Sequence, residues 1–82
     1  MEEIMERFFI IEYQDWDENG NPVHEIPQEY LDVGTGKLII YSSREKAKSD
    51  AKQLSNLTRT FTINSMSYWI EKDRVKEFLV ID

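Results

Sequence analysis

One short run of residues limits the fold more than any other part of the sequence: Arg7-Phe-Phe-Ile-Ile-Glu-Tyr13. It is rich in aromatic and β-branched side chains, is too short for a helix and is followed by turn residues, so it predicts a strand. Alternation along this strand places Phe9, Ile11 and Tyr13 on one face, and Phe8 and Ile10 on the other. Apolar side chains on both faces predict a central place in a sheet.

A second strand is predicted at Lys37-Leu-Ile-Ile-Tyr41, followed directly by a helix. The sequence Ser42-Ser-Arg-Glu45 matches a capping box, in which Ser42 caps the first turn and the glutamate reaches back to its backbone. The helix is predicted over about residues 43–54, ending with Asn56 in the left-handed conformation. The apolar stripe of this helix is Ala47, Ala51 and Leu54.

The last third of the chain alternates between apolar and polar residues. A half-buried strand is predicted over 58–63, and the alternation continues to Ile70 after a bulge at Asn64-Ser65. A polar turn over 71–74 leads to a final strand over 75–81, which is expected to pair back on 61–70 as a hairpin.

These elements predict an α+β fold: a small, mostly antiparallel sheet of four or five strands, with one helix packed on one face. The predicted order is strand, optional short strand, strand, helix, strand, strand. Eighty-two residues form a single domain, 1–82, because so short a chain buries only about 60–65% of its unfolded surface.

The segment between the first two strands is the least regular part of the sequence. An Asn-Gly turn is predicted over 17–22, and Val23 and Ile26 are candidates for a short return strand that Pro27 confines to a sheet edge. Residues 28–31 are expected to form a helical turn, and 34–36 a flexible connector. Long irregular segments in small domains often carry function.

Asp15, Asp17, Asn19 and Gly20 spell the first half of a calcium-binding loop. The bidentate carboxylate at position 12 is missing, because that position is Ile26, and Pro22 lies inside the loop. The stretch is therefore interpreted as an acidic turn and no metal ligand is assigned. A weak calcium-binding turn at Asp15–Gly20 remains an alternative.

Several chemistries have no support in this sequence. The chain has no cysteine, which excludes disulfides, thiolate chemistry and Cys-type zinc sites. His24 is its single histidine, no nucleophile or phosphate-binding motif is present, and so no catalytic residue, enzymatic activity or cofactor is predicted. No apolar run approaches the roughly 20 residues of a membrane span, and the acidic start is unlike a signal peptide. The expected location is cytoplasmic, without membrane association.

Charge is distributed unevenly along the chain, with a balance of −9 over residues 1–36 and +3 over 37–82. Acidic side chains with embedded aromatics predict a surface that anchors and steers a basic protein partner. We call this set the acidic-aromatic surface: Glu12, Asp15, Trp16, Asp17, Glu18, Glu25, Glu29, Tyr30 and Asp32. The alternative is a nucleic-acid-binding module on the basic helix, with Arg44, Lys48, Lys52 and Arg59 on phosphates.

The stretch Tyr41-Ser-Ser-Arg-Glu-Lys-Ala-Lys-Ser-Asp-Ala-Lys-Gln-Leu54 resembles a layout of short accessory proteins of bacteriophages and prophages, in which a strand leads into an alanine- and lysine-rich helix and then a β-hairpin. The resemblance covers about residues 37–82. It implies a small non-enzymatic protein that binds a host or viral protein, as anti-defence inhibitors such as anti-CRISPR proteins do. The expected partner is basic and handles nucleic acid, and a monomer or homodimer is expected.

Overall fold

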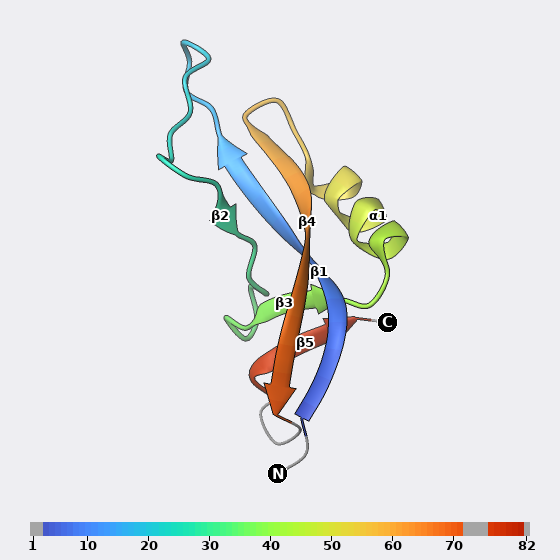
Figure 1. Ribbon diagram of the computed structural model, residues 1–82. Helices are drawn as coiled ribbons and strands as arrows, with labels where there is room; N and C mark the ends of the chain where they lie inside the picture. Colours follow the sequence, from blue (N-terminus) through green and yellow to red (C-terminus); the bar gives the residue numbers. More distant parts are fainter. Residues whose placement is uncertain (1–2, 72–75, 82) are drawn as a thin grey trace.

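The computed structural model describes residues 3–71 and 76–81, which form one helix and a mixed sheet of five strands (Figure 1). The α+β class predicted from the sequence is confirmed. The elements are β1 (Glu3–Asp15), β2 (Gln28–Glu29), β3 (Leu38–Tyr41), α1 (Arg44–Leu54), β4 (Arg59–Glu71) and β5 (Phe78–Ile81).

The longest strand pairing of the fold is an antiparallel ribbon of β1 and β4 (Figure 1). Its register runs without interruption from Glu3 opposite Glu71 to Asp15 opposite Arg59. The bulge predicted at Asn64-Ser65 is therefore wrong, since these residues pair in sequence with Ile10 and Phe9.

The other edge of β1 pairs with β2 and β3, both antiparallel, and β3 pairs in parallel with β5. The predicted hairpin of the last strand on 61–70 is wrong, because β4 pairs with β1 and β5 pairs with β3. The long alternating pattern of β4 has a partner of equal length in β1, whereas β5 has only 4 residues. The turn predicted over 71–74 is wrong at its first residue, because Glu71 is the last residue of β4. Residues 72–74 and the predicted strand start at Val75 lie outside the described residues.

The core lies on both faces of β1, as its sequence predicts. On the helix-covered face, the buried residues are Ile11, Ile39, Tyr41, Ala47 and Ala51. On the opposite face they are Phe8, Ile10 and Ile40. The predicted stripe of α1 is confirmed, since Ala47 is fully buried, Ala51 is 7% exposed and Leu54 is half-buried. Small alanine side chains let the helix approach the sheet closely.

The predicted end of α1 at Leu54 is confirmed, whereas the N-cap and the conformation of Asn56 differ from the prediction. Ser43, not Ser42, is the N-cap, and its hydroxyl accepts a hydrogen bond from the Lys46 amide at 3.1 Å. Ser42 instead donates its amide to the Ile81 carbonyl at 3.0 Å, so it still belongs to the sheet. Asn56 does not adopt positive φ. Its side chain accepts hydrogen bonds from the amides of Thr58 and Arg59, which turns the chain directly into β4.

The segment between β1 and β3 is a turn followed by an edge strand. The turn predicted over 17–22 is confirmed, with Gly20 at φ 79°. A short return is formed at Pro22 and Val23, whereas Ile26 is 69% exposed and outside any strand. The helical turn predicted over 28–31 is wrong, because Gln28–Glu29 forms β2 at the edge of the sheet. Its ladder continues with the Tyr30 amide on the Ile11 carbonyl, at 2.9 Å.

Within the described residues, no helix is long and apolar enough to cross a membrane.

Candidate functional site

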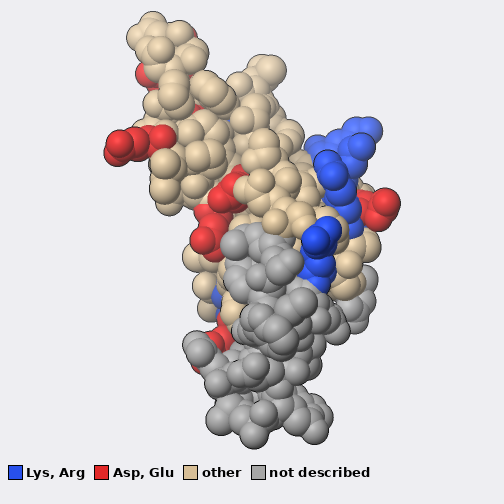
Figure 2. Space-filling view, viewed as in Figure 1, with Lys and Arg blue, Asp and Glu red and all other residues tan. Residues whose placement is uncertain are grey.

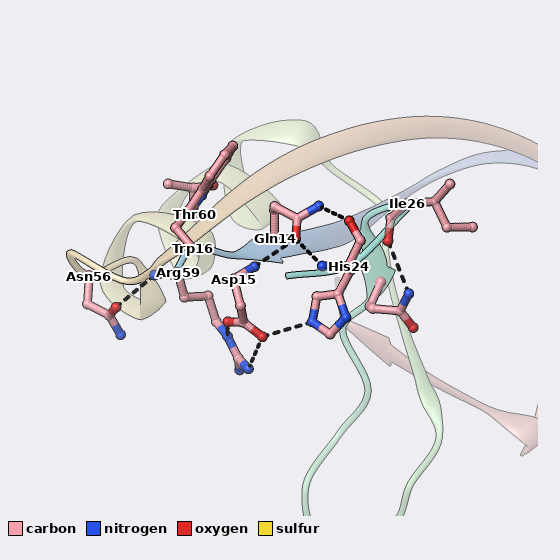
Figure 3. Close-up of polar contacts among 9 residues, drawn as sticks. Gln14, Asp15, Trp16, His24, Ile26, Asn56, Arg59 and Thr60 are labelled. Atoms are coloured by element: carbon pink, nitrogen blue, oxygen red, sulfur yellow. Dashed lines mark hydrogen bonds and ion pairs between the residues drawn. The ribbon is translucent and has the colours of Figure 1, made fainter. Parts of the chain in front are cut away.

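The carboxylate of Asp15 organises the end of the β1–β4 ribbon (Figure 3). Its two oxygens accept the Nε and Nη2 protons of Arg59, with donor–acceptor distances of 2.5 and 3.0 Å. Oδ2 also lies 2.9 Å from Nε2 of His24. The hydrogen bonds from Arg59, and then from His24, lower the pKa of Asp15 from 3.8 to about 2. The carboxylate is therefore ionised at neutral pH and joins β4 to the returning chain.

Gln14 makes a second connection between β1 and the returning chain (Figure 3). Its side-chain amide donates to the His24 carbonyl, and its side-chain oxygen accepts the His24 amide, each at 2.9 Å. The same oxygen accepts the Asp15 amide at 3.1 Å. Gln14 thus acts like a short piece of neighbouring strand. No spacing or motif in the sequence indicates this role.

Aromatic rings pack beneath these polar bonds. The Arg59 guanidinium lies 4.2 Å from the centroid of the Tyr13 ring. Tyr13 contacts His24 edge-on at 5.7 Å, and Tyr30 contacts Phe61 edge-on at 5.6 Å. Arg59 is therefore a structural cation here, half-buried between an aromatic ring and a carboxylate.

The oxygens of the calcium-like motif are used within the turn. Oδ1 of Asp17 accepts the amides of Asn19 and Asn21, both at 2.9 Å, while Asp15 binds Arg59 and His24. Among the described residues, no group of three or more His, Cys, Asp or Glu side chains is placed to hold a metal ion. These contacts match the interpretation of the motif as an Asx-rich turn.

The structure divides the acidic-aromatic surface into two sets. One set forms internal contacts: Glu12 bonds the Asn64 side chain, Asp15 binds Arg59, Tyr30 packs on Phe61 and Asp32 accepts the amide and hydroxyl of Thr35. The other set is exposed, although Asp17 also bonds within its own turn and Trp16 bonds Thr60. This set is Trp16, Asp17, Glu18, Glu25 and Glu29. Sequence position could not separate the two, because the separation depends on side-chain direction.

We call residues 16–33 the exposed segment. Its large apolar side chains point into solvent: Trp16 at 36%, Val23 at 58%, Ile26 at 69%, Leu31 at 46% and Val33 at 90% exposed. The Trp16 indole is held in place because its Nε1 donates to the Thr60 hydroxyl at 2.9 Å. Beside it, a shallow hollow of about 500 Å³ is lined by Trp16, Asp17, Glu18, Asn19 and Thr58. Carboxylates and apolar side chains therefore alternate along one exposed stretch.

Three of the four predicted basic residues lie together. Arg44, Lys48 and Lys52 are exposed on α1 and line one groove, while Arg59 bonds Asp15 elsewhere. Figure 2 shows Lys and Arg gathered over α1, and acidic side chains mainly over β2 and the neighbouring loop. The uneven charge of the sequence thus becomes two surfaces of opposite sign.

The ring of His24 belongs to the bonds that anchor the returning chain. Its Nε2 contacts the carboxylate of Asp15, which also holds the guanidinium of Arg59. His24 and Asp15 therefore fasten the returning loop to β1.

Comparisons of this chain with protein-family models, curated protein sequences and solved structures found no match.

Proposed function

We propose that this chain is a small non-enzymatic binding protein, a phage-type accessory protein that inhibits or modulates a basic, nucleic-acid-handling protein in the cytoplasm of a bacterial host. The observation that carries the proposal is the composition of the exposed segment. It presents five large apolar side chains between four exposed carboxylates, those of Asp17, Glu18, Glu25 and Glu29.

Apolar side chains that are about half or more exposed gain free energy when a partner covers them. Ile26 and Val33 supply most of the area for such burial, while the carboxylates favour a basic partner and speed its approach. The Asp15 and Gln14 bonds hold this segment against β1 before any partner arrives. Less conformational entropy is then lost on binding.

A protein that grips nucleic acid uses a basic surface for the phosphates. An acidic protein that occupies this surface competes with the nucleic acid directly. The proposed mode of action is therefore stoichiometric competition, without chemistry.

The experiment is capture from bacterial lysate on the immobilised chain, followed by a mobility-shift assay of the purified captured protein with its nucleic acid. Adding the wild-type chain is expected to release the nucleic acid at near-equimolar ratio. The double variant E18K/E25K is expected to lose most of this effect, and Trp16→Ala to weaken it by about tenfold or more. Asp15 and Asp17 are kept, because reversal of Asp15 would break the loop anchor and reversal of Asp17 would break its bonds to the Asn19 and Asn21 amides.

The matched control is Glu45→Lys, an exposed acid on α1. It reverses a charge away from the exposed segment and is expected to compete like the wild type. Equal competition by E18K/E25K and the wild type, at both low and moderate salt, would contradict the proposal. The nucleic-acid alternative on the basic helix stays a prediction, and three of its four residues, Arg44, Lys48 and Lys52, share one groove.

A further inference from the structure

We propose a second docking surface, independent of the exposed segment: the groove between α1 and the outer edge of β4 binds an extended acidic peptide segment of another protein as an added strand. The proposal rests on two observations, the unpaired edge of β4 and the three cations beside it.

The backbone of β4 has one strand neighbour among the described residues, β1. In an antiparallel pair, alternate residues turn their N–H and C=O groups away from the partner. The Trp16 amide donates to the Thr58 carbonyl at 2.8 Å, so Trp16 and Thr58 are a hydrogen-bonded pair of the ribbon. Every second pair of residues along the ribbon is then also hydrogen-bonded. The pairs between them therefore direct their backbone groups outward.

The edge of β1 that faces away from β4 shows the same alternation of backbone groups. The carbonyls of Asp15 and Ile11 point away from β4, because they accept the amides of Val23 and Tyr30. On β4, the outward groups consequently belong to Phe61, Ile63 and Ser65. The Arg59 carbonyl is taken by the Asn56 amide at 3.1 Å, so the open edge begins at Phe61.

An open edge of this length is a template for another strand. Each outward N–H and C=O can pair with an extended peptide, which is how β-augmentation provides affinity. The described part of β4 carries few of the devices that block such pairing, since its register has no bulge and its sequence has no proline.

The side chains that line the groove beside this edge determine which charge the bound peptide should carry. It has a volume of about 370 Å³ and is lined by Arg44, Lys48, Ala51, Lys52, Ser55, Phe61, Thr62 and Ile63. Thr62 belongs to the opposite side-chain face from Phe61 and Ile63, so the groove reaches the strand edge itself. Its lining contains three cations and no carboxylate, which favours an acidic peptide.

The spacing of the cations fits a strand. Arg44, Lys48 and Lys52 follow one another at four-residue steps, about 6 Å apart along the helix axis. Side chains on one face of a strand repeat at about 6.6 Å. A peptide with a carboxylate at every second residue therefore presents its carboxylates at a spacing close to that of the cations. A symmetric second copy joined through β4 is disfavoured, because it would bring two such rows of cations together.

The test is fluorescence anisotropy with a labelled peptide of about eight residues that alternates glutamate and threonine. Saturable binding to the wild-type chain is expected. Lys48→Glu is expected to weaken it at least tenfold. The control, Lys46→Glu, makes the same charge change on the same helix but outside the groove, and is expected to weaken binding less than threefold. Equal effects of the two substitutions, or no saturation up to about 1 mM peptide, overturn the proposal.

Two N-methylated peptides test strand addition. Methylation of alternate amides on the edge that faces β4 is expected to abolish binding, and methylation on the other edge to leave it unchanged. Equal binding of both peptides overturns strand addition.

Two other outcomes also overturn the proposal. If the chain binds an oligothymidylate in preference to the peptide and Lys48→Glu weakens that binding, the groove belongs to nucleic acid. If sedimentation shows a dimer that excludes the peptide, the groove belongs to a second copy. The E18K/E25K variant is expected to bind the peptide normally, which separates this surface from the proposed function.

Discussion

The exposed segment and strand β3 are held in place by different forces. Ile39, Ile40 and Tyr41 of β3 are 6%, 0% and 1% exposed, and apolar contacts cover them on both faces of the sheet. The exposed segment contributes almost no side chain to this core, and Gln14 and Asp15 fasten it through polar bonds. The central sheet therefore depends on packing, whereas the candidate binding surface depends on a few directed bonds that single substitutions or pH can remove.

The largest effect is expected from Ile40→Ala in β3, which is fully buried. Removing its side chain leaves a cavity and should lower the free energy of unfolding by about 2–5 kcal/mol. The measurement is urea denaturation followed by circular dichroism. The matched control in the neighbouring strand is Val80→Ala, because Val80 is 38% exposed and should cost clearly less. Similar costs at the two positions would contradict the assignment of Ile40 to the core.

A smaller, local effect is expected from Gln14→Ala. This substitution removes the two bonds to the His24 backbone and the bond to the Asp15 amide, and should cost about 1–2 kcal/mol. Hydrogen exchange should accelerate mainly in residues 22–26, while β3 amides keep most of their protection. Gln28→Ala is the control, because its side chain bonds only the nearby Ile26 carbonyl. Uniform acceleration over the whole chain would show that the two regions are not separable.

The local elements were predictable from sequence where a short pattern determines them. The two-faced apolar pattern of residues 7–13 and the stripe of Ala47, Ala51 and Leu54 both describe a single element and its neighbours in the chain. Pairing partners were not predictable in this way, since β5 could pair with β4 or with β3 without any change in its own pattern. The N-cap was misplaced by one residue because Ser42 and Ser43 are equally good caps, and only the bond of Ser42 to Ile81 decides between them.

At the candidate site, too, the sequence predicts local character but not long-range partners. The sequence indicates the acidic and aromatic character of residues 12–32, but not which carboxylates are free. Asp15 and Arg59 are 44 residues apart in the chain and meet only because the β1–β4 register places them opposite each other. A correct register predicted from sequence would have revealed this pair, whereas the role of Gln14 depends on the path of the returning loop.

One polar bond lies at the boundary of the core, between β3 and α1. The Tyr41 hydroxyl donates to the Asp50 carboxylate of α1 at 2.9 Å. Burial, and then Asp50, raise the pKa of Tyr41 above its ordinary value of 10.0. The folded state therefore binds this proton more tightly than the unfolded state. Its contribution to stability is complete below pH 10 and is lost as pH rises further.

Tyr41→Phe should lower the free energy of unfolding at neutral pH by about 1 kcal/mol, because it removes one hydrogen bond without leaving a cavity. It should also remove the part of the alkaline loss of stability that Tyr41 causes. Tyr13→Phe is the control, since Tyr13 is a half-buried tyrosine that is not among the causes of the raised Tyr41 pKa. Identical stability curves of Tyr41→Phe and the wild type above pH 10 would contradict the role given to the bond.

The smallest effect concerns the pH dependence of the exposed segment. Because Arg59 and His24 lower the pKa of Asp15 to about 2, the folded state binds this proton more weakly than the unfolded state. The carboxylate thus contributes stability above about pH 3.8, and this contribution is lost as pH falls towards about 2.

Carbon-detected NMR titration of the Asp15 carboxyl should show this low midpoint. In the Arg59→Ala variant, which lacks the first of the two causes, the midpoint should move up towards 3.8. Arg44→Ala removes an equal charge on α1 and should leave the Asp15 titration unchanged. A midpoint near 3.8 in the wild-type chain would mean that Arg59 does not hold Asp15 in solution, and that the exposed segment reaches its partner without this anchor.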